Sequence, residues 1–258
     1  MTSAVADTSL LVRRSINRTL RQPANLVFSF MFPMLLLAVN SGGLNSATKI
    51  PDFPANSYLT FALAVPFVQG ALFASNSAGT NIAVDIETGF MSRLALTPIS
   101  RRALLAGQLA GVVALGLAQA IVYFAVGEAA GAGFAAGVGG IFVLMALSVM
   151  VTLAFGSIGA LAALRTGSGE AVQGLFPLFF VCLFLSSMAL PRNLIEQDWF
   201  RTIATWNPVS YILEAIRSLL ITGWDGAALA KGFAAAGGIA LIGIALSARA
   251  MRTRVIRT

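Results

Sequence analysis

The sequence of 258 residues contains no histidine, one cysteine and only two lysines. The lack of histidine excludes a histidine metal site, a histidine proton shuttle and a Ser-His-Asp triad. The single cysteine, Cys182, forms neither an intrachain disulfide nor a thiolate metal cluster. Neither Lys49 nor Lys231 follows a glycine, so the phosphate-binding pattern GxxxxGK[ST] is missing. We therefore expect no catalytic residue, metal site or cofactor site in this chain, and no ATP hydrolysis by it.

Charged residues are also scarce, at 10% of the chain, while hydrophobic residues make up 57% and the mean hydropathy is +0.84. Soluble domains carry about 25% charged residues. A hydrocarbon core of about 30 Å is crossed by roughly 20 apolar residues in a helix. Six stretches are suitable: Leu26–Leu44, Tyr58–Ala78, Leu104–Val126, Ala135–Leu164, Ala171–Leu190 and Gly226–Ala248. The composition thus predicts an integral membrane protein.

The apolar stretches are rich in Ala, Leu, Gly and Phe and lack the two-residue alternation that a membrane β-barrel requires. The predicted fold class is all-α, a polytopic membrane protein with six transmembrane helices in one domain, residues 1–258. Pro33, Pro66 and Pro177 lie within the spans and predict kinks.

Basic residues are distributed unequally between the two sides of these spans. Twelve of the 17 fall on the side that carries both termini, and five fall on the other. Because cytoplasmic connections carry the excess of Lys and Arg, both termini are predicted to be cytoplasmic. The net charge of +7 reflects this asymmetry, and nucleic-acid binding is the poorer explanation. We expect the basic tail after Ser247 to contact anionic lipid head groups.

The amino-terminal region predicts an interfacial helix over residues 8–22. Val12, Ile16 and Leu20 recur every four residues while arginines occupy the opposite side, a pattern that lies flat at the head groups. The first apolar run starts only after Arg21, which argues against a cleavable signal. An unordered basic tail is the alternative.

The cytoplasmic connection after the second span, residues 84–97, has the pattern of a short amphipathic helix that docks against the membrane face or a partner. Its polar members are Asp85, Glu87 and Arg93, and its apolar members are Ile86, Phe90, Leu94 and Leu96. Gly89 predicts an interruption, and Pro98 with Ser100 predicts the end of the element and the start of the next helix. An ordinary solvated connection is the alternative.

The segment 191–224 on the outer side is too polar to cross the bilayer and too apolar for a free loop. It holds all three tryptophans, and indole rings prefer the head-group interface, so we expect interfacial or re-entrant helices here. Asn207 and Pro208 predict a helix start, after which Glu214 and Arg217 can pair on one face. From the residues alone, this helix could simply cap the bundle and hold the fifth and sixth spans.

A polar stripe in the second span consists of Gln69, Ser75, Asn76 and Ser77. Such a stripe either lines a transport pathway or bonds to a neighbouring helix, and the sequence leaves both open.

Two stretches carry a family resemblance. In the first, the matching residues are Asp85, Glu87, Gly89, Arg93, Leu94, Pro98, Ser100 and Arg101. The second is NPVSYILEAIRSLLITG, residues Asn207 to Gly223. They resemble the acidic-x-E-x-G…R-L…T-P-x-S-R and N-P…Y…A-x-R…G segments of ABC-2 type permeases, membrane subunits of ATP-binding-cassette exporters that include the daunorubicin-resistance and nodulation-factor permeases. The number and order of the spans extend the resemblance over nearly the whole chain.

The resemblance implies a permease of the bacterial plasma membrane that moves an amphipathic, drug-like or lipid-linked substrate. It would pair with a second permease copy, identical or paralogous, and with two copies of a separate ATPase subunit that binds ATP and Mg²⁺. Asp85 to Leu94 would be the coupling helix seated in that ATPase, with Glu87 and Arg93 as the first choices for contact. The implied coupling residues are Asp85, Glu87, Gly89, Phe90, Arg93, Leu94, Pro98 and Arg101, and those of an outer gate are Asn207, Pro208, Tyr211, Glu214 and Arg217.

Three other classes are compatible with the residues. A stand-alone secondary transporter is suggested by two amphipathic inserts, one on the inner side after the second span and one on the outer side after the fifth. Inverted repeats would place them in this way, although the amino-acid sequence shows no repeat. A membrane enzyme is disfavoured, because the connections lack clustered nucleophiles, bases or metal ligands. An accessory scaffold is the third. Co-purification of an ATPase separates the permease from all three.

Overall fold

The computed structural model describes residues 12–18, 23–95 and 101–256, and the regular secondary structure of these residues is entirely helical. The all-α fold class is thereby confirmed for the described part of the chain. Its longer helices are α2 (Pro23–Leu44), α4 (Ala64–Glu87), α6 (Arg101–Ala129), α7 (Gly137–Thr166), α8 (Gly169–Phe184) and α11 (Gly226–Ile256). Shorter elements connect them: η1 (Asn45–Lys49), α3 (Tyr58–Ala62), α5 (Phe90–Ala95), η2 (Arg192–Leu194), α9 (Asp198–Trp206), α10 (Pro208–Arg217) and the π-helical η3 (Ser218–Thr222). Residues 12–18 form a helical segment before α2.

Five of the six expected spans are confirmed as helices long and apolar enough to cross a membrane. They are Leu26–Lys49, Tyr58–Glu87, Leu104–Ala129, Gly137–Thr166 and Gly226–Thr253. The stretch expected at Ala171–Leu190 instead forms α8, which has 16 residues and is therefore about 24 Å long. The chain leaves the helix at Leu185, so α8 alone is shorter than a hydrocarbon core of about 30 Å.

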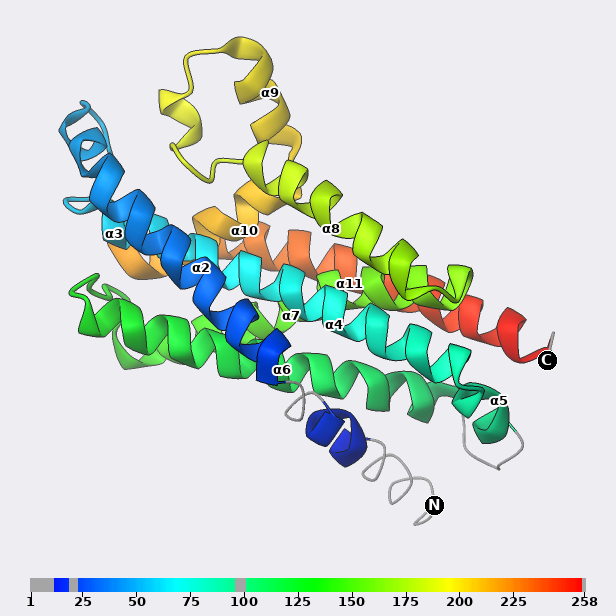
Figure 1. The fold of residues 1–258 in the computed structure, drawn as a ribbon. Helices are drawn as coiled ribbons and strands as arrows, with labels where there is room; N and C mark the ends of the chain where they lie inside the picture. Colours follow the sequence, from blue (N-terminus) through cyan, green and yellow to red (C-terminus); the bar gives the residue numbers. More distant parts are fainter. Residues whose placement is uncertain (1–11, 19–22, 96–100, 257–258) are drawn as a thin grey trace.

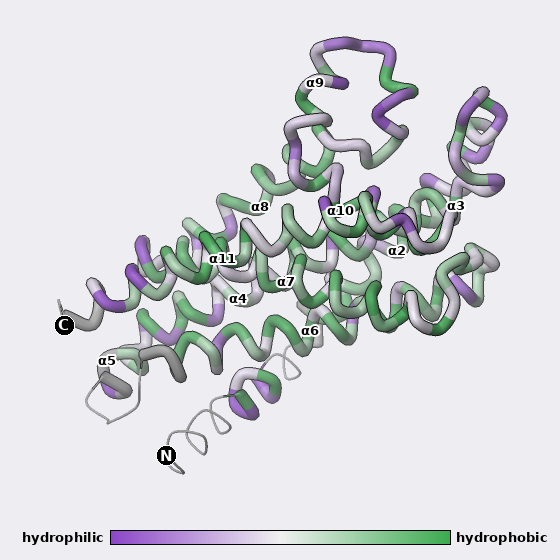
Figure 2. Tube along the Cα trace, turned by 180° about the vertical axis from the view of Figure 1, so that it is seen from behind, coloured by the Kyte–Doolittle hydropathy of each residue, from purple (hydrophilic) through white to green (hydrophobic). Residues whose placement is uncertain are grey.

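The two ends of the bundle differ in what they carry (Figure 1). Helix 12–18, α5 and the carboxyl-terminal end of α11 lie at one end, which we call the α5 end. η1, α3 and α9 lie at the opposite end, which we call the α9 end. Figure 2 shows hydrophilic residues gathered toward both ends, with apolar helix between them. Residues of the predicted outer segment 191–224 and of the predicted cytoplasmic connection thus lie at opposite ends, as expected from the sequence.

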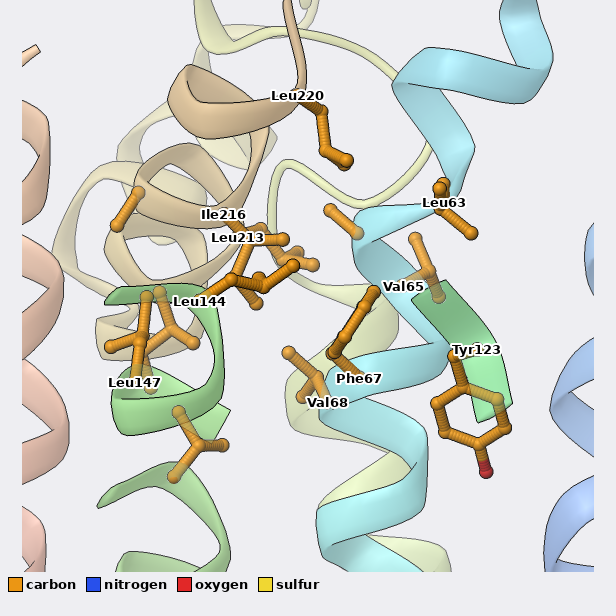
Figure 3. Packing of buried hydrophobic residues seen from close by; sticks show 14 of the residues in the cluster. Leu63, Val65, Phe67, Val68, Tyr123, Leu144, Leu147, Leu213, Ile216 and Leu220 are labelled. Atoms are coloured by element: carbon orange, nitrogen blue, oxygen red, sulfur yellow. The ribbon is translucent and has the colours of Figure 1, made fainter. Parts of the chain in front are cut away.

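The second span is the centre of the bundle. Within Tyr58–Glu87, 89% of an 18-residue apolar stretch is buried inside the protein. The corresponding fraction is 17% in Leu26–Lys49 and 28% in Gly226–Thr253. α4 packs against α2, α6, α7, α8 and α10. Figure 3 shows part of this core, in which Phe67 and Val68 of α4 lie with Leu213 and Ile216 of α10 and Leu144 of α7.

Small residues let α4 and α7 approach each other closely. A Cβ atom at Gly159 of α7 would lie 2.3 Å from the backbone oxygen of Ser75 in α4. A Cβ at Gly79 would lie 2.8 Å from the backbone oxygen of Gly159. The Ser75 hydroxyl donates a hydrogen bond of 2.6 Å to the Phe155 carbonyl. Close backbone approach combined with interhelical hydrogen bonds is the usual way for helices to associate in lipid.

The kink expected at Pro66 is a break in the helix. α3 ends at Ala62 and α4 begins at Ala64, with Leu63 between them. Pro66 has no backbone N–H, and its ring would collide with the carbonyl of residue 62 in a continuous helix. Pro33 and Pro177 lie inside α2 and α8, which continue past them.

Gly159→Ala tests the α4–α7 contact, with Gly174→Ala as the matched control. A Cβ atom added at Gly174 in α8 would meet no other atom within 4 Å, whereas one added at Gly159 would meet the Ser75 oxygen. Both changes raise helix propensity equally, but the first overpacks the interface and should lower the free energy of unfolding by about 1–3 kcal/mol. Denaturation of both variants in detergent measures the difference. Equal stability of the two variants would contradict the contact.

Candidate functional site

The α4–α5 connection contains a sharp turn rather than one continuous helix. α4 continues to Glu87, and α5 starts at Phe90. Gly89 between them has φ of +68°, a left-handed conformation that glycine adopts without strain. The interruption expected at Gly89 is confirmed. Asp85 to Leu94 is therefore not one continuous helix, because Asp85 belongs to the last turn of α4. The coupling role of this segment stays a prediction.

Asp85 is buried, with only 2% of its surface exposed. Its carboxylate accepts hydrogen bonds from Arg14 Nη2 at 2.9 Å, Arg18 Nη1 at 2.7 Å and Gln108 Nε2 at 2.7 Å. Arg18 Nη1 also donates to the Asn81 carbonyl at 3.2 Å. Asp85 therefore joins α4 to α6 and to helix 12–18.

The same cluster reaches α5. The Arg14 guanidinium lies 3.8 Å from the centre of the Phe90 ring, a cation–π contact. Ser15 packs against α6, because its hydroxyl donates to the Gln108 carbonyl at 3.4 Å and fills the space beside Gly111. The start of α5 is consequently tied to two other helical segments.

Sequence reasoning missed Arg14, Arg18 and Gln108 as members of this cluster. It assigned the two arginines to lipid head groups, because arginines opposite an apolar stripe are typical of an interfacial helix. They lie 71 and 67 residues from Asp85 in the chain. The amphipathic pattern of residues 12–18 predicts that both arginines lie on one side of the helix, but it does not predict which residue they bind.

Two charged side chains of the connection, Glu87 and Arg93, are exposed. Glu87 Oε1 accepts a long hydrogen bond of 3.4 Å from the backbone N–H of Gly169, at the start of α8. Arg93 Nη2 donates to the Thr88 carbonyl at 3.2 Å. Both side chains are therefore accessible at the α5 end while held loosely to the turn.

The structure describes the remaining predicted coupling residues to different extents. Phe90 is half-buried beneath Arg14. For Leu94 and Arg101 the structure describes the backbone alone, and Pro98 lies outside the described residues.

At the α9 end, Asn207 and Pro208 start α10 as expected. The Asn207 side-chain oxygen accepts from the Val209 N–H at 2.9 Å, and Pro208 occupies the first turn. Asn207 Nδ2 donates to the carbonyls of Cys182 at 2.6 Å and Leu185 at 3.1 Å. One side chain thus caps the start of α10 and binds carbonyls at the end of α8.

The expected pairing of Glu214 with Arg217 is wrong among the described contacts. Glu214 instead binds Arg192, with Nε–Oε1 at 2.7 Å and Nη2–Oε2 at 2.5 Å. The Arg192 guanidinium also lies 4.6 Å from the centre of the Tyr211 ring. Burial acts to lower the pKa of Arg192, but the hydrogen bond and charge of Glu214 outweigh it and raise the pKa. Bidentate geometry explains this choice of partner, since a fork of two N–H groups matches a carboxylate.

Arg217 is directed into the protein, with 5% of its surface exposed. It donates to three carbonyls: Nε to Phe61 at 3.1 Å, Nη1 to Ser187 at 2.5 Å and Nη2 to Met188 at 2.6 Å. Its guanidinium also stacks 3.6 Å from the centre of the Phe61 ring. Arg217 therefore connects α10 to α3 and to the turn after α8.

The polar stripe of the second span lies inside the bundle. Ser75 is fully buried and bonds to α7, so for this residue the structure favours the helix-contact alternative. Gln69 is 2% exposed, and its Oε1 has no hydrogen-bond partner among the described residues. The buried Oδ1 of Asn76 also has none there.

Arg217→Gln should destabilise the packing of α10 against α3 and the turn after α8, because it leaves buried carbonyls without donors. We expect the free energy of unfolding to fall by at least about 2 kcal/mol. Arg201→Gln is the control, since Arg201 is exposed and pairs with Asp198, which is also exposed and lies one helical turn away. Thermal melting of both variants in detergent measures the effect, and equal midpoints would argue against a structural role for Arg217.

Comparison with known proteins adds to this geometry. Residues 6–221 match the family described as ABC-2 type transporter. The chain is similar to the Daunorubicin resistance ABC transporter permease protein DrrB1 of Streptomyces coeruleorubidus, with 27% identity over 84% of this chain and 76% of that protein. It is 23% identical to the Probable doxorubicin resistance ABC transporter permease protein DrrC of Mycobacterium tuberculosis, over 85% of this chain and 78% of that protein.

A third relative is the Putative transport permease ycf38 of Porphyra purpurea, 28% identical over 86% of this chain and 76% of that protein. The family match covers most of the sequence, including the first of the two segments that suggested the resemblance and nearly all of the second. The chain therefore belongs to the ABC-2 type transporter family and is a multi-pass membrane protein.

Proposed function

We propose that this chain is the transmembrane permease subunit of an ATP-binding-cassette exporter whose ATP is hydrolysed by a separate ATPase subunit. The family match supports the proposal, as do the names of two relatives, which are drug-resistance ABC transporter permeases. The observation that carries it is the α4–α5 connection, where exposed Glu87 and Arg93 flank a turn that a buried ion cluster holds to the bundle. An ATPase surface would need such accessible charges on a rigid support.

In this proposal the ATPase binds α5 and moves it. Glu87 and Arg93 set the register of the contact, and Leu94, Pro98 and Arg101 stay predicted contacts. Asp85 acts within the chain instead: because Arg14 touches both Asp85 and Phe90, a displacement of α5 would carry α4 and helix 12–18 with it. Nucleotide-driven motion would thus reach the central helix of the bundle directly.

We propose that the α5 end is cytoplasmic and that α8 is the sixth crossing. The excess of basic residues on this side supports the orientation. Helix 12–18 and the end of α11 lie at the same end (Figure 1), which requires an even number of crossings. The five long helices supply five crossings. α8 supplies the sixth, with the turn after Phe184 and the segment at the α9 end spanning the part of the bilayer that α8 is too short to cross.

The proposed substrate is an amphipathic compound, drug-like or lipid-linked. Aromatic rings from α2, α4 and α8 contact one another around the buried Phe73. The more exposed rings provide an apolar face for such a molecule: Phe28, Phe32, Phe176 and Phe180. Gln69 and Asn76 stay candidates for the pathway, and Tyr211 with α10 for an outer gate. We further propose a second permease copy, identical or paralogous, and two ATPase copies, with ATP and Mg²⁺ bound by the ATPase rather than by this chain.

Glu87→Gln and Arg93→Gln test the ATPase contact, with Glu128→Gln as control. Glu128 is also exposed and lies at the end of α6 that is remote from α5. Each test variant should insert normally, yet retain less co-purified ATPase and transport at least about tenfold more slowly, because interface charges fix register. Co-purification and transport assays in membrane vesicles measure both effects. Unchanged ATPase capture and transport in both variants would refute the coupling assignment.

Thiol labelling tests the proposed orientation. Cys182 is exposed and is first replaced by serine; Thr88→Cys and Asp198→Cys are then introduced separately. In intact cells an impermeant maleimide should react at position 198, while position 88 should react only after the membrane is permeabilised. Labelling of position 88 alone in intact cells would show the opposite orientation.

A further inference from the structure

A groove with a volume of about 710 Å³ lies between α6 and α11. Leu109 of α6, Leu153 of α7, and Ile244 and Met251 of α11 are among its lining residues. Its volume falls within the range of about 300–1,000 Å³ that is typical of ligand sites. Every lining residue is apolar except Arg252.

The groove has the depth of one bilayer leaflet. On α6 it extends from Leu105 to Ala114, and on α11 from Ile244 to Arg252. At a rise of about 1.5 Å per residue these stretches are about 14 Å and about 12 Å long. One leaflet contributes half of a hydrocarbon core about 30 Å thick. The groove therefore covers the leaflet at the α5 end, where α6 begins and α11 ends.

The shape of the groove favours a single hydrocarbon chain. Ala106, Ala110 and Ala114 recur every four residues along its α6 wall, and Ala248 lies on its α11 wall. Their small side chains leave the space open. A transmembrane helix would seek contact across both leaflets, whereas this groove ends after one. An acyl chain enters from one head-group region and ends near the middle of the bilayer, as the groove does.

Arg252 supplies a charge at the head-group end of the groove. It is exposed and has no ion-pair partner among the residues that the structure describes. A guanidinium binds phosphate oxygens through two parallel N–H groups. We propose that the groove binds an anionic phospholipid of this leaflet, with one acyl chain between α6 and α11 and its phosphate on Arg252.

The bound chain would fill the space between α6 and α11, which both pack on α7. None of the residues that line the groove belongs to the Asp85 cluster or to α5, so the site does not depend on which subunit binds α5. In the orientation proposed above, the leaflet is the cytoplasmic one.

Photo-crosslinking in nanodiscs tests the proposal. The discs contain phosphatidylethanolamine and phosphatidylglycerol, with a diazirine in the middle of the acyl chain of one lipid or the other. Mass spectrometry should locate crosslinks on the groove walls of α6 and α11, and phosphatidylglycerol should crosslink there about fivefold more than phosphatidylethanolamine. Equal crosslinking of the two lipids in the unmodified protein would overturn the proposal.

Variants separate the head-group contact from the chain contact. Arg252→Gln should abolish the preference for phosphatidylglycerol, while Arg249→Gln should keep it, because Arg249 is an exposed arginine of the same helix that does not line the groove. Ala110→Phe should lower crosslinking of both lipids by filling the groove. An unchanged preference for phosphatidylglycerol in Arg252→Gln would overturn the assignment. A photoreactive residue introduced at position 106 tests the occupant in cells. If it crosslinks to protein instead of lipid, another helix occupies the groove and the proposal is overturned.

Discussion

The backbone contact between α4 and α7 is the constraint on which the rest of the bundle depends. At Gly159 any side chain would collide with the Ser75 carbonyl, and at Gly79 with that of Gly159. In lipid, helices gain little from apolar burial against each other, so close packing and hydrogen bonds such as Ser75 to Phe155 must hold them. This contact places α4 in the interior, and the other helices then surround it. A charge at the end of α4 is consequently buried as well, and it needs partners from other segments.

Arginine side chains from other segments bind the second span at both of its ends. Arg14 and Arg18 bind Asp85 at the α5 end, and Arg217 binds the carbonyl of Phe61 at the α9 end. In each case a segment outside the long helices is joined to the central one. Phe61 belongs to α3, whose separation from α4 at Leu63 is caused by Pro66. The second span is therefore anchored at both ends by guanidinium groups, and the short elements at the two ends of the bundle are held to it.

Local signals explain what the sequence could predict. Long apolar runs located five of the spans, the Asn207-Pro208 pair located the start of α10, and Gly89 located the turn after α4. The partners of charged residues could not be predicted, because they depend on folding: Asp85 meets arginines about 70 residues away, and Glu214 meets Arg192 instead of Arg217 on its own helix. The shortness of α8 was also missed, since Met188, Ala189 and Leu190 continue the apolar composition past Ser186 and Ser187. Where the helix ends, Asn207 from another segment binds the carbonyls of Cys182 and Leu185, a contact that the sequence does not reveal.

If α5 binds an ATPase as proposed, the burial of Asp85 changes how force would pass through the α4–α5 connection. An exposed carboxylate could serve only as a contact for a partner, and its loss would weaken that contact alone. A buried carboxylate bound by two arginines and a glutamine resists separation, because losing these partners leaves a desolvated charge. A push on α5 is then easier to relieve by moving α4, α5 and helix 12–18 together than by pulling them apart. Since α4 packs on five other helices, that movement would reach the interior of the bundle without a hinge at Asp85.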